Sequence, residues 1–508
     1  MSLKIHNTLT RRAEPFDTVA PGVVRMYVCG PNLYGPAHVG HALSYTFFDV
    51  LRRYLEYKEY EVRHIQNFTD IEDRILDRAQ REGRSIFEIA SEYLTRFLEE
   101  MDSLNIQRAH AYPRATEVIP KMLEIIQGLI AKGHAYAVDG DVYYRVLSFA
   151  PYGSLSGRSL DQMQAGARIE VDERKEHPMD FVLWKAAKPG EPNWPSPWGL
   201  GRPGWHIECS AMSMQYLGEQ LDIHGGGDDL RFPHHENEIA QSEGFTGRPP
   251  FARFWIHNAL MKPPVGEEMH RHLGNFVSIQ EALGKYEADA IRLFILSAHY
   301  RTPSRWTDEA VEAAARGVER LRTALANADA ALERAPDLPA TGPMADRAEA
   351  ARPAFERAMD DDLGTPGAVA ALFDLAAEIN RGAGAVLQGH RQAGAGLAAA
   401  AAMLRRLAAV LGLRLAYVQL PPQVVGGLRE MFESLLASEP GLFPDGGAVR
   451  TPEDIVAALL AGRDRARRSR RFDAADGIRR QLGDLGIIVE DLPGGSRWRV
   501  AVHKDART

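Results

Sequence analysis

The segment MYVCGPNLYGPAHVGHAL, residues 26–43, decides the fold that this sequence predicts. Its first residues overlap the end of a short apolar run, residues 23–29. Such a run, followed by a Gly/Pro turn, is typical of a buried strand. A helical stretch, HALSYTFFDVLRRYLEY, then starts at His41. Backbone N–H groups at such a junction point at one spot and attract phosphate. We expect a phosphate site flanked by His38 and His41, with Gly40 allowing close approach; alternatively, the histidines only cap the helix.

The next residues repeat the order of strand and helix. EVRHIQNFTD, residues 61–70, is typical of a second strand. Ser85 and Glu88 form a capping box at the start of a further helix, whose apolar residues from Ile86 to Met101 keep helical spacing. Strands that alternate with helices in this way predict a parallel α/β sheet.

Composition limits the class of protein. The 508 residues carry a formal net charge of -8 and include two cysteines, so we exclude a disulfide-built fold and a generic nucleic-acid coat. The N-terminal sequence has no hydrophobic signal core, which favours the cytoplasm. The alanine-rich stretch 393–413 is interrupted by Arg405 and Arg406, and it predicts a buried helix and no membrane partner.

A possible metal site involves both cysteines. Cys29 ends the first strand segment, Cys209 lies in GWHIECSAM, and FPHHENEIA places His234 and Glu238 one helical turn apart. Two thiolates, an imidazole and a carboxylate are typical zinc ligands, and zinc would bind a small thiol. Either cysteine alone could be a small buried apolar residue. The four residues together predict one Zn²⁺ per chain.

Another candidate site lies at the end of the strand LDIHGGG. Its glycines, of which Gly227 is the last, precede Asp228 and Asp229 at a position where open α/β sheets bind ligands. A turn alone would also explain this pair of acids. Trp205, just before the second cysteine, could line a pocket or fill the core.

The rest of the chain divides by composition. The stretch YAVDGDVYYRV predicts a hairpin inside an insertion at about 135–200, and after about 313 the chain becomes helical. A C-terminal unit from about 421 contains RDRARRSRR, residues 463–471, with Trp498 further on. Arginines next to an aromatic ring suit single-stranded RNA, although a charge run can also be a solvated face.

As a set, these motifs resemble the cysteinyl-tRNA synthetase family over essentially the whole chain. The most specific matches are GRPGWHIECSAM and FPHHENEIAQ, and further matches include HVGH, NFTDIEDRI, YGSLSGR and FDAADGIRRQLGDLGIIVED. The resemblance implies an α/β fold: a Rossmann-type class I synthetase catalytic domain with a connective insertion, then an all-α helical bundle and a small α+β anticodon-binding domain. The implied parts are 1–125 and 201–256 (catalytic), 126–200 (insertion), 257–312 (stem contact), 313–420 (bundle) and 421–508 (anticodon binding).

The resemblance also implies roles for individual residues. Zn²⁺ would be held by Cys29, Cys209, His234 and Glu238. Cysteine would be bound by Thr69, Trp205 and Asp229. ATP, with Mg²⁺, would be bound by His38, Gly40, His41, Gly227 and Arg271, of which His38, His41 and Arg271 are the catalytic residues. From the arginine run and the nearby aromatic ring, we expect Arg467, Arg468, Arg471 and Trp498 to contact tRNA(Cys), and we expect a monomer.

One motif departs from the family. The sequence EMHRH, residues 268–272, stands where the family carries KMSKS. Glu268 would repel the triphosphate, and Arg271 keeps a cation that is not equivalent to lysine. Our main hypothesis is a cysteine–tRNA ligase that activates cysteine with ATP and transfers it to tRNA(Cys). The alternatives are a paralogue that activates cysteine for another acceptor, and a catalytically weak protein that binds tRNA or cysteine.

Overall fold

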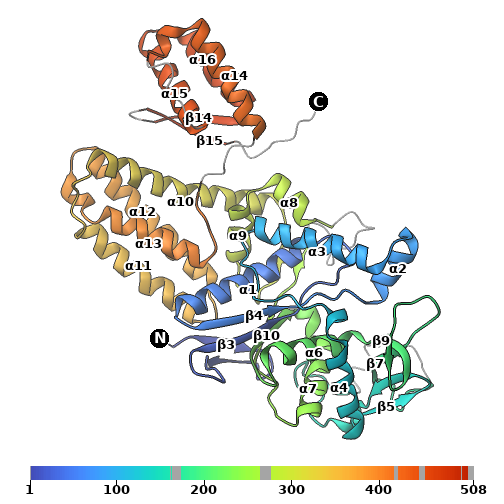
Figure 1. Ribbon diagram of the computed structural model, residues 1–508. Coiled ribbons are helices and arrows are strands. Elements are labelled where there is room, and N and C mark those ends of the chain that lie inside the picture. The colour runs from blue at the N-terminus through green and yellow to red at the C-terminus, as the bar shows by residue number, and fades with distance from the viewer. Residues whose placement is uncertain are drawn as a thin grey trace. The chain divides into compact units, whose positions relative to one another are not determined.

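A four-stranded parallel sheet organises the N-terminal part of the chain in the computed structural model (Figure 1). In the order β11–β10–β3–β4, its strands are β3 (Val23–Val28), β4 (Glu61–Gln66), β10 (Leu221–Gly227) and β11 (Ala252–Asn258). Each neighbouring pair is parallel, so the carboxyl ends of all four strands lie at one edge. Cys29, Thr69 and Asp229 each follow one of these ends. The predicted parallel α/β sheet is confirmed.

The chain divides into two compact units. One is made of residues 1–283 and 288–414, and the other of residues 284–287 and 415–508. The structure describes residues 2–160, 162, 173–263, 276–416, 422–444, 452–492 and 495–500. Arg271 and the rest of the EMHRH segment therefore lie outside the described residues.

Helices cover the sheet, which explains why most residues of its central strands are buried. Six of the seven residues of β10 are buried, as expected for a strand inside a parallel sheet. The helix α1 (Val39–Tyr57) connects β3 to β4, while α6 (Trp205–Leu217) precedes β10 and α7 (Glu236–Thr246) follows it. In Figure 1, α1 lies above the sheet and α6 and α7 lie below it.

A five-stranded antiparallel sheet separates the two halves of the parallel sheet along the sequence. In the order β5–β6–β7–β9–β8, its strands are β5 (Ala135–Val138), β6 (Asp141–Tyr144), β7 (Phe181–Ala186), β8 (Trp194–Ser196) and β9 (Gly199–Pro203). The predicted β5–β6 hairpin is confirmed. Asp139 and Gly140 form its turn with φ angles of 50° and 85°, the left-handed values that a two-residue type I′ turn requires.

The predicted capping box begins the third helix. Ser85 Oγ accepts a hydrogen bond from Glu88 N at 3.2 Å, and Glu88 Oε2 accepts one from Ser85 N at 2.8 Å. This helix is α3 (Ile86–Ser103), between α2 (Asp73–Glu82) and α4 (Ile119–Ala131). The other described elements before the bundle are β1 (Lys4–Asn7), β2 (Arg12–Pro15), β12 (Met261–Lys262), α8 (Ile279–Lys285), α9 (Ala288–Leu296) and β13 (Ser304–Arg305).

The predicted helical bundle is confirmed. It consists of α10 (Asp308–Arg334), α11 (Pro343–Asp360), α12 (Thr365–Leu387) and α13 (Leu397–Val410), which pack on one another. Within the described residues, only Arg391–Val410 is long and apolar enough to cross a membrane, and 56% of that stretch is buried inside the protein. Leu397, Leu404 and Leu407 of α13 are fully buried, which is the pattern of a core helix.

A buried arginine joins the bundle to the sheet domain. Arg292 of α9 is fully buried and bonds to Asp49 Oδ2 of α1 at 2.6 Å. Its guanidinium also donates to the carbonyl of Leu411, just after α13, at 2.9 Å, and to that of Leu104, just after α3, at 3.1 Å. A side chain at Gly412 would put its Cβ 1.9 Å from the Arg292 Nη2 atom. The guanidinium thus replaces its lost hydration with contacts to three separate segments.

We expect the Arg292→Met variant to lower the free energy of unfolding by about 3 kcal/mol, because the substitution leaves the buried Asp49 carboxylate with a weaker set of partners. Thermal unfolding monitored by circular dichroism would measure the change. The Arg248→Met variant is the control, since the Arg248 side chain forms an exposed ion pair with Glu219. Equal unfolding midpoints for the two variants would contradict the proposed role of Arg292.

The C-terminal unit is a small α+β domain, as predicted. It contains α14 (Pro422–Ser438), α15 (Pro452–Arg468), α16 (Phe472–Asp484) and an antiparallel hairpin of β14 (Ile487–Leu492) and β15 (Gly495–Val500). Its own apolar core includes the fully buried residues Leu428, Val456, Leu459, Leu482 and Ile487.

Candidate metal centre and substrate pocket

The four predicted metal ligands lie together at the carboxyl edge of the sheet. Cys29 Sγ lies 3.8 Å from both Cys209 Sγ and Glu238 Oε1. His234 Nε2 lies 3.4 Å from Cys209 Sγ and 3.1 Å from Glu238 Oε1. One potential ligand atom from each residue therefore faces a common centre.

These distances fit a tetrahedral zinc site. In a tetrahedron, two ligand atoms are separated by about 1.6 times the metal–ligand distance, which gives about 3.8 Å for two sulfurs and about 3.3 Å for two nitrogen or oxygen atoms. The separations between Cys29 and Cys209, at 3.8 Å, and between His234 and Glu238, at 3.1 Å, are close to these values. The residues present thus match the chemistry and the spacing that zinc requires.

Three parts of the fold bring the four ligands together. Cys29 continues β3, and its N–H donates to the carbonyl of Gly225 on β10 at 3.0 Å. Cys209 lies on the second turn of α6. His234 lies in a helical turn, Arg231–His235, that leads into α7, where Glu238 lies in the first turn. The predicted spacing of one helical turn between His234 and Glu238 therefore holds.

Burial governs the charge of this cluster. None of the four ligands is more than 5% exposed, and Glu238 is fully buried. Desolvation raises the pKa of the Cys29 thiol and of the Glu238 carboxyl well above their ordinary values, and it also raises the pKa of Cys209. Desolvation lowers the pKa of His234, which keeps the imidazole neutral, as a metal ligand must be. A divalent cation would offset the cost of burying the ionised cysteines and carboxylate.

Further histidines surround the ligands, and the sequence analysis did not predict them. His224 Nε2 lies 2.7 Å from Glu238 Oε2, and burial lowers the pKa of His224 to about 3, so a neutral imidazole donates this bond. His206 Nδ1 lies 2.9 Å from His234 Nδ1. Because His234 Nε2 faces the metal position, its proton is on Nδ1 and is donated to His206. A sequence signal existed: these histidines cluster between residues 206 and 235.

His235 extends this network from the sulfur of Cys29 to the protein interior. His235 Nε2 lies 3.3 Å from Cys29 Sγ, and His235 Nδ1 lies 2.7 Å from His257 Nε2. His257 Nδ1 in turn lies 2.9 Å from Thr8 Oγ1. If Cys29 is a thiolate, Thr8, His257 and His235 each donate a hydrogen bond in the direction of the Cys29 sulfur.

A second possible ligand set consists of Cys29, His224, His235 and Glu238, which also lie close together. However, the separation of 2.7 Å between His224 and Glu238 is a hydrogen-bond distance.

We expect the His224→Gln variant to bind zinc about 10- to 100-fold more weakly, because it loses the donor that orients the Glu238 carboxylate. Competition with a chromophoric chelator would measure the affinity. The control is His134→Gln, because His134 is a half-buried histidine bonded to Ser148 instead. Equal zinc affinities in the two variants would show that His224 does not support Glu238.

The three residues predicted to bind cysteine have different surroundings. Thr69 is buried, and its backbone pairs with the loop after Cys29 through bonds to Pro31 and Leu33. Trp205 is half-buried and stacks on the ligand His234, with ring centroids 4.3 Å apart. Asp229 lies in the short turn after β10, with its side chain exposed. Trp205 thus contacts one of the predicted metal ligands, and Thr69 bonds to the loop that follows another.

Gly227, predicted to bind ATP, ends β10 close to the side chain of Asp229. A Cβ atom at residue 227 would be 2.4 Å from Asp229 Oδ1, the end of an exposed side chain that would have to turn away. Arg271, the remaining predicted ATP ligand from the loop, lies outside the part of the chain that the structure describes.

His38 and His41 cap the helix α1 reciprocally. His38 Nδ1 accepts a hydrogen bond from Gly40 N at 3.0 Å, and His41 Nδ1 accepts one from His38 N at 3.1 Å. A Cβ at Gly40 would lie 2.8 Å from the His38 ring. Since Nδ1 is the acceptor in both neutral rings, Nε2 carries the proton and is a donor. The capping alternative is therefore observed.

The expectation of unused backbone N–H groups at this helix start is wrong. Val39 N donates to the carbonyl of Val277, and Gly40 N donates to the His38 ring. The N–H groups of His41 and Ala42 both donate to the carbonyl of His38. Phosphate binding at this position would therefore depend on imidazole N–H groups and not on backbone ones.

The predicted tRNA contacts all lie in the C-terminal unit. Arg467 and Arg468 are exposed at the end of α15. Arg471 is also exposed, and it binds both carboxylate oxygens of Glu439 at 2.6 and 2.7 Å. Trp498 is partly buried and packs against the apolar core of the unit. A substitution of Trp498 would therefore disturb folding, so it cannot test base stacking alone.

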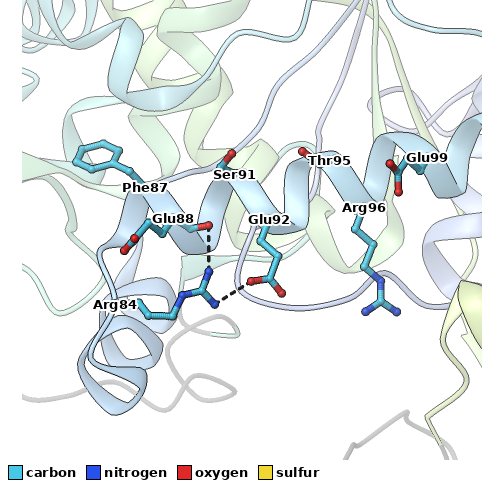
Figure 2. Close-up of a pocket in the computed structure, with 8 residues that line it drawn as sticks. All are labelled: Arg84, Phe87, Glu88, Ser91, Glu92, Thr95, Arg96 and Glu99. Carbon is cyan, nitrogen blue, oxygen red and sulfur yellow. Dashed lines mark hydrogen bonds and ion pairs between the residues drawn. The ribbon is translucent and has the colours of Figure 1, made fainter.

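A shallow groove follows the exposed side of α3 (Figure 2). Its lining is mostly charged or polar, and Arg84 bonds to Glu92 at 2.8 Å and to the carbonyl of Glu88. Phe87 is its exposed apolar residue, at 54%. None of the residues predicted to bind metal, cysteine or ATP lines this groove.

Known protein families match three parts of the chain. The family described as the tRNA synthetases class I (C) catalytic domain matches residues 15–316, and the DALR domain matches residues 354–416. The cysteinyl-tRNA ligase anticodon binding domain matches residues 453–499. These matches correspond to the sheet domain with its insertion, part of the bundle, and the C-terminal unit.

Some similar proteins match almost the full length of this chain. A cysteine–tRNA ligase of Dehalococcoides mccartyi is 47% identical over 505 residues, which cover 98% of this chain and 100% of the relative. The cysteine–tRNA ligase of Geobacter sulfurreducens is 45% identical over 510 residues, with coverage of 98% and 100%. The solved Mycobacterium tuberculosis methionyl-tRNA synthetase, in complex with methionyl-adenylate, has the same fold: the TM-score is 0.59 at 15% identity, covering 81% of this chain and 94% of that chain. The chain belongs to the cysteinyl-tRNA synthetase family.

Proposed function

We propose that this chain is a cysteine–tRNA ligase, which joins cysteine to tRNA(Cys) with ATP in two steps. The observation that carries the proposal is the buried cluster of Cys29, Cys209, His234 and Glu238, whose spacing fits zinc. The full-length similarity to cysteine–tRNA ligases supports it. The cluster and the similarity support the same substrate, because a metal that binds thiols distinguishes cysteine from other small amino acids.

Selection of cysteine over serine requires chemistry, because the two differ only by sulfur in place of oxygen and shape separates them poorly. When bound, Zn²⁺ would supply a soft cation that favours a thiolate ligand. Trp205, stacked on His234, would form a wall of the pocket beside that ligand. Thr69 and Asp229, which follow the ends of β4 and β10 at the same edge of the sheet, would contact the polar groups of the amino acid.

In the first step, a carboxylate oxygen of cysteine forms a bond to the α-phosphorus of ATP, and the bond from that phosphorus to the leaving pyrophosphate breaks. The carboxylate is already ionised at neutral pH, so no general base is needed, and positioning and charge stabilisation are enough. His38 and His41 would donate from Nε2 to phosphate oxygens, because their Nδ1 atoms accept the capping bonds. In the second step, a terminal ribose hydroxyl of the tRNA attacks the acyl carbon and AMP leaves.

The substituted EMHRH segment favours a second candidate function: activation of cysteine for an acceptor other than tRNA(Cys). Two assays distinguish the candidates, namely cysteine-dependent exchange between ATP and pyrophosphate, and charging of tRNA(Cys). We expect both activities. Exchange without charging would support the other acceptor, and the absence of exchange would indicate a protein that only binds cysteine or tRNA.

We further propose that the enzyme is a cytoplasmic monomer. The burial of Arg391–Val410 inside the helical bundle supports the absence of a membrane segment there. Sedimentation equilibrium of the purified chain should give the mass of a single chain, 56.3 kDa. A concentration-independent mass of twice that value would contradict the proposed monomer.

A further inference from the structure

A buried carboxylate with no assigned role lies beside the proposed cysteine pocket. Glu208, in the first turn of α6, is fully buried. Its Oε2 accepts a hydrogen bond from Thr69 Oγ1 at 2.9 Å, and Thr69 is itself 1% exposed. Among the described residues, Glu208 Oε1 has no hydrogen-bond partner. A buried acid held by one neutral hydroxyl needs an explanation.

Thr69 has a fixed place relative to the metal ligands. Its N–H and carbonyl bond to Pro31 and Leu33, two and four residues after Cys29. Glu208 directly precedes Cys209 on the other side of the cluster. The hydrogen bond from Thr69 to Glu208 therefore connects the two segments that carry the thiol ligands.

The hydrogen bond to Glu208 also determines whether the Thr69 hydroxyl donates or accepts further hydrogen bonds. A hydroxyl has one proton and two lone pairs. When Thr69 donates its proton to Glu208, the Thr69 oxygen can only accept further hydrogen bonds. The group of cysteine that donates hydrogen bonds and carries positive charge is its α-ammonium, whereas its carboxylate would be repelled.

The carboxyl groups near Thr69 also favour the α-ammonium of cysteine. Asp70 is a buried acid next in the chain to Thr69, and its carboxylate accepts two bonds from Thr116. Glu72 has an oxygen that is buried without a partner among the described residues. Within those residues, neither Glu208 nor Asp70 nor Glu72 forms an ion pair with a lysine or arginine within 4.0 Å. The surroundings of Thr69 are thus rich in carboxyl groups, and burial raises the pKa of all three, so a cation placed there would offset the cost of ionising them.

We propose that Glu208 is a positioning residue for the amino group of cysteine: it orients the Thr69 hydroxyl as an acceptor for the α-ammonium. This inference rests on the proposed function, since it assumes that cysteine binds beside the cluster. It assigns to Glu208 a role in recognising the amino group, separate from recognition of the thiol by the metal.

The test compares cysteine with 3-mercaptopropionate, which has the same thiol and carboxylate but no amino group. Binding of each ligand to the zinc-loaded full chain would be measured by calorimetry, together with the zinc content of each variant. We expect Glu208→Gln to weaken cysteine binding about tenfold or more, because a bond to a charged group is lost or misdirected, and to leave 3-mercaptopropionate within about twofold.

Two further variants separate positioning from packing. Thr69→Val should cause the same selective loss, and Thr69→Ser, which keeps the hydroxyl, should bind cysteine nearly as the unchanged chain does. The double variant Glu208→Gln with Thr69→Val should be no worse than either single change, because both act through one hydrogen bond.

The outcomes can be distinguished. Equal weakening of both ligands, or losses that multiply in the double variant, would overturn the role of Glu208 while leaving the proposed function in place. Failure of the unchanged, zinc-loaded chain to bind cysteine at all would instead reject the proposed function, and with it this inference.

Discussion

Replacing Cys209 with serine is expected to remove the bound zinc and, with it, the activation of cysteine. A serine hydroxyl is a poor zinc ligand, and three donors would remain around a buried centre whose fourth position is taken by Cys209 Sγ, 3.8 Å from Cys29 Sγ. Changes to groups that merely orient a ligand weaken metal binding about 10- to 100-fold. Loss of a ligand itself should exceed that range, so we expect a decrease of more than about 100-fold.

The measurements are zinc content by elemental analysis and cysteine-dependent ATP–pyrophosphate exchange. Ser213→Ala is a suitable control: it removes a buried hydroxyl from the same helix, and that hydroxyl bonds only to the carbonyl of Ser210. The control should retain one zinc per chain and its exchange activity. A Cys209→Ser protein with a full complement of zinc would reject the assignment of this ligand.

The parallel sheet and the meeting of four predicted side chains at its edge could be predicted, because they depend on local patterns and residue chemistry. The apolar run ending at Cys29 predicts a strand, and the strands and helices that follow predict the parallel sheet. In such a sheet all strand ends share one edge, so ligands far apart in the chain can meet there. The type of each residue, together with the spacing of His234 and Glu238, was enough to predict which four side chains meet; their role as metal ligands stays a prediction.

The parts that could not be predicted depend on contacts between distant segments. The N–H of Val39 at the start of α1 bonds to Val277, more than 200 residues later, and no local pattern reveals that acceptor. Glu208 lies in α6, and its partner Thr69 follows β4, far away in the sequence. Trp498 packs on a core formed by several elements of the C-terminal unit, so its sequence neighbours, which are arginines, gave no sign of its burial.

Replacing the two adjacent arginines Arg467 and Arg468 with glutamine is expected to weaken tRNA binding while leaving cysteine activation unchanged. Both side chains are exposed at the end of α15, and the catalytic sheet belongs to the other unit. Each arginine that contacts a single-stranded phosphate contributes about 0.7 to the slope of log affinity against log salt. The double variant should therefore lower the slope by about 1.4 and raise KM for tRNA(Cys).

The matched control is the double variant Arg405→Gln with Arg406→Gln, since these are also adjacent, exposed arginines on a helix. Arg405 binds Asp329 at 2.7 Å, Arg406 lies over the ring of Tyr57, and neither is a predicted tRNA contact. The control should change the salt slope much less. If the Arg467 and Arg468 variant lost ATP–pyrophosphate exchange in proportion to tRNA charging, the C-terminal unit would not be a separable RNA-binding module. Exchange that stays constant while the salt slope falls would instead separate recognition of the tRNA from the chemistry at the metal centre.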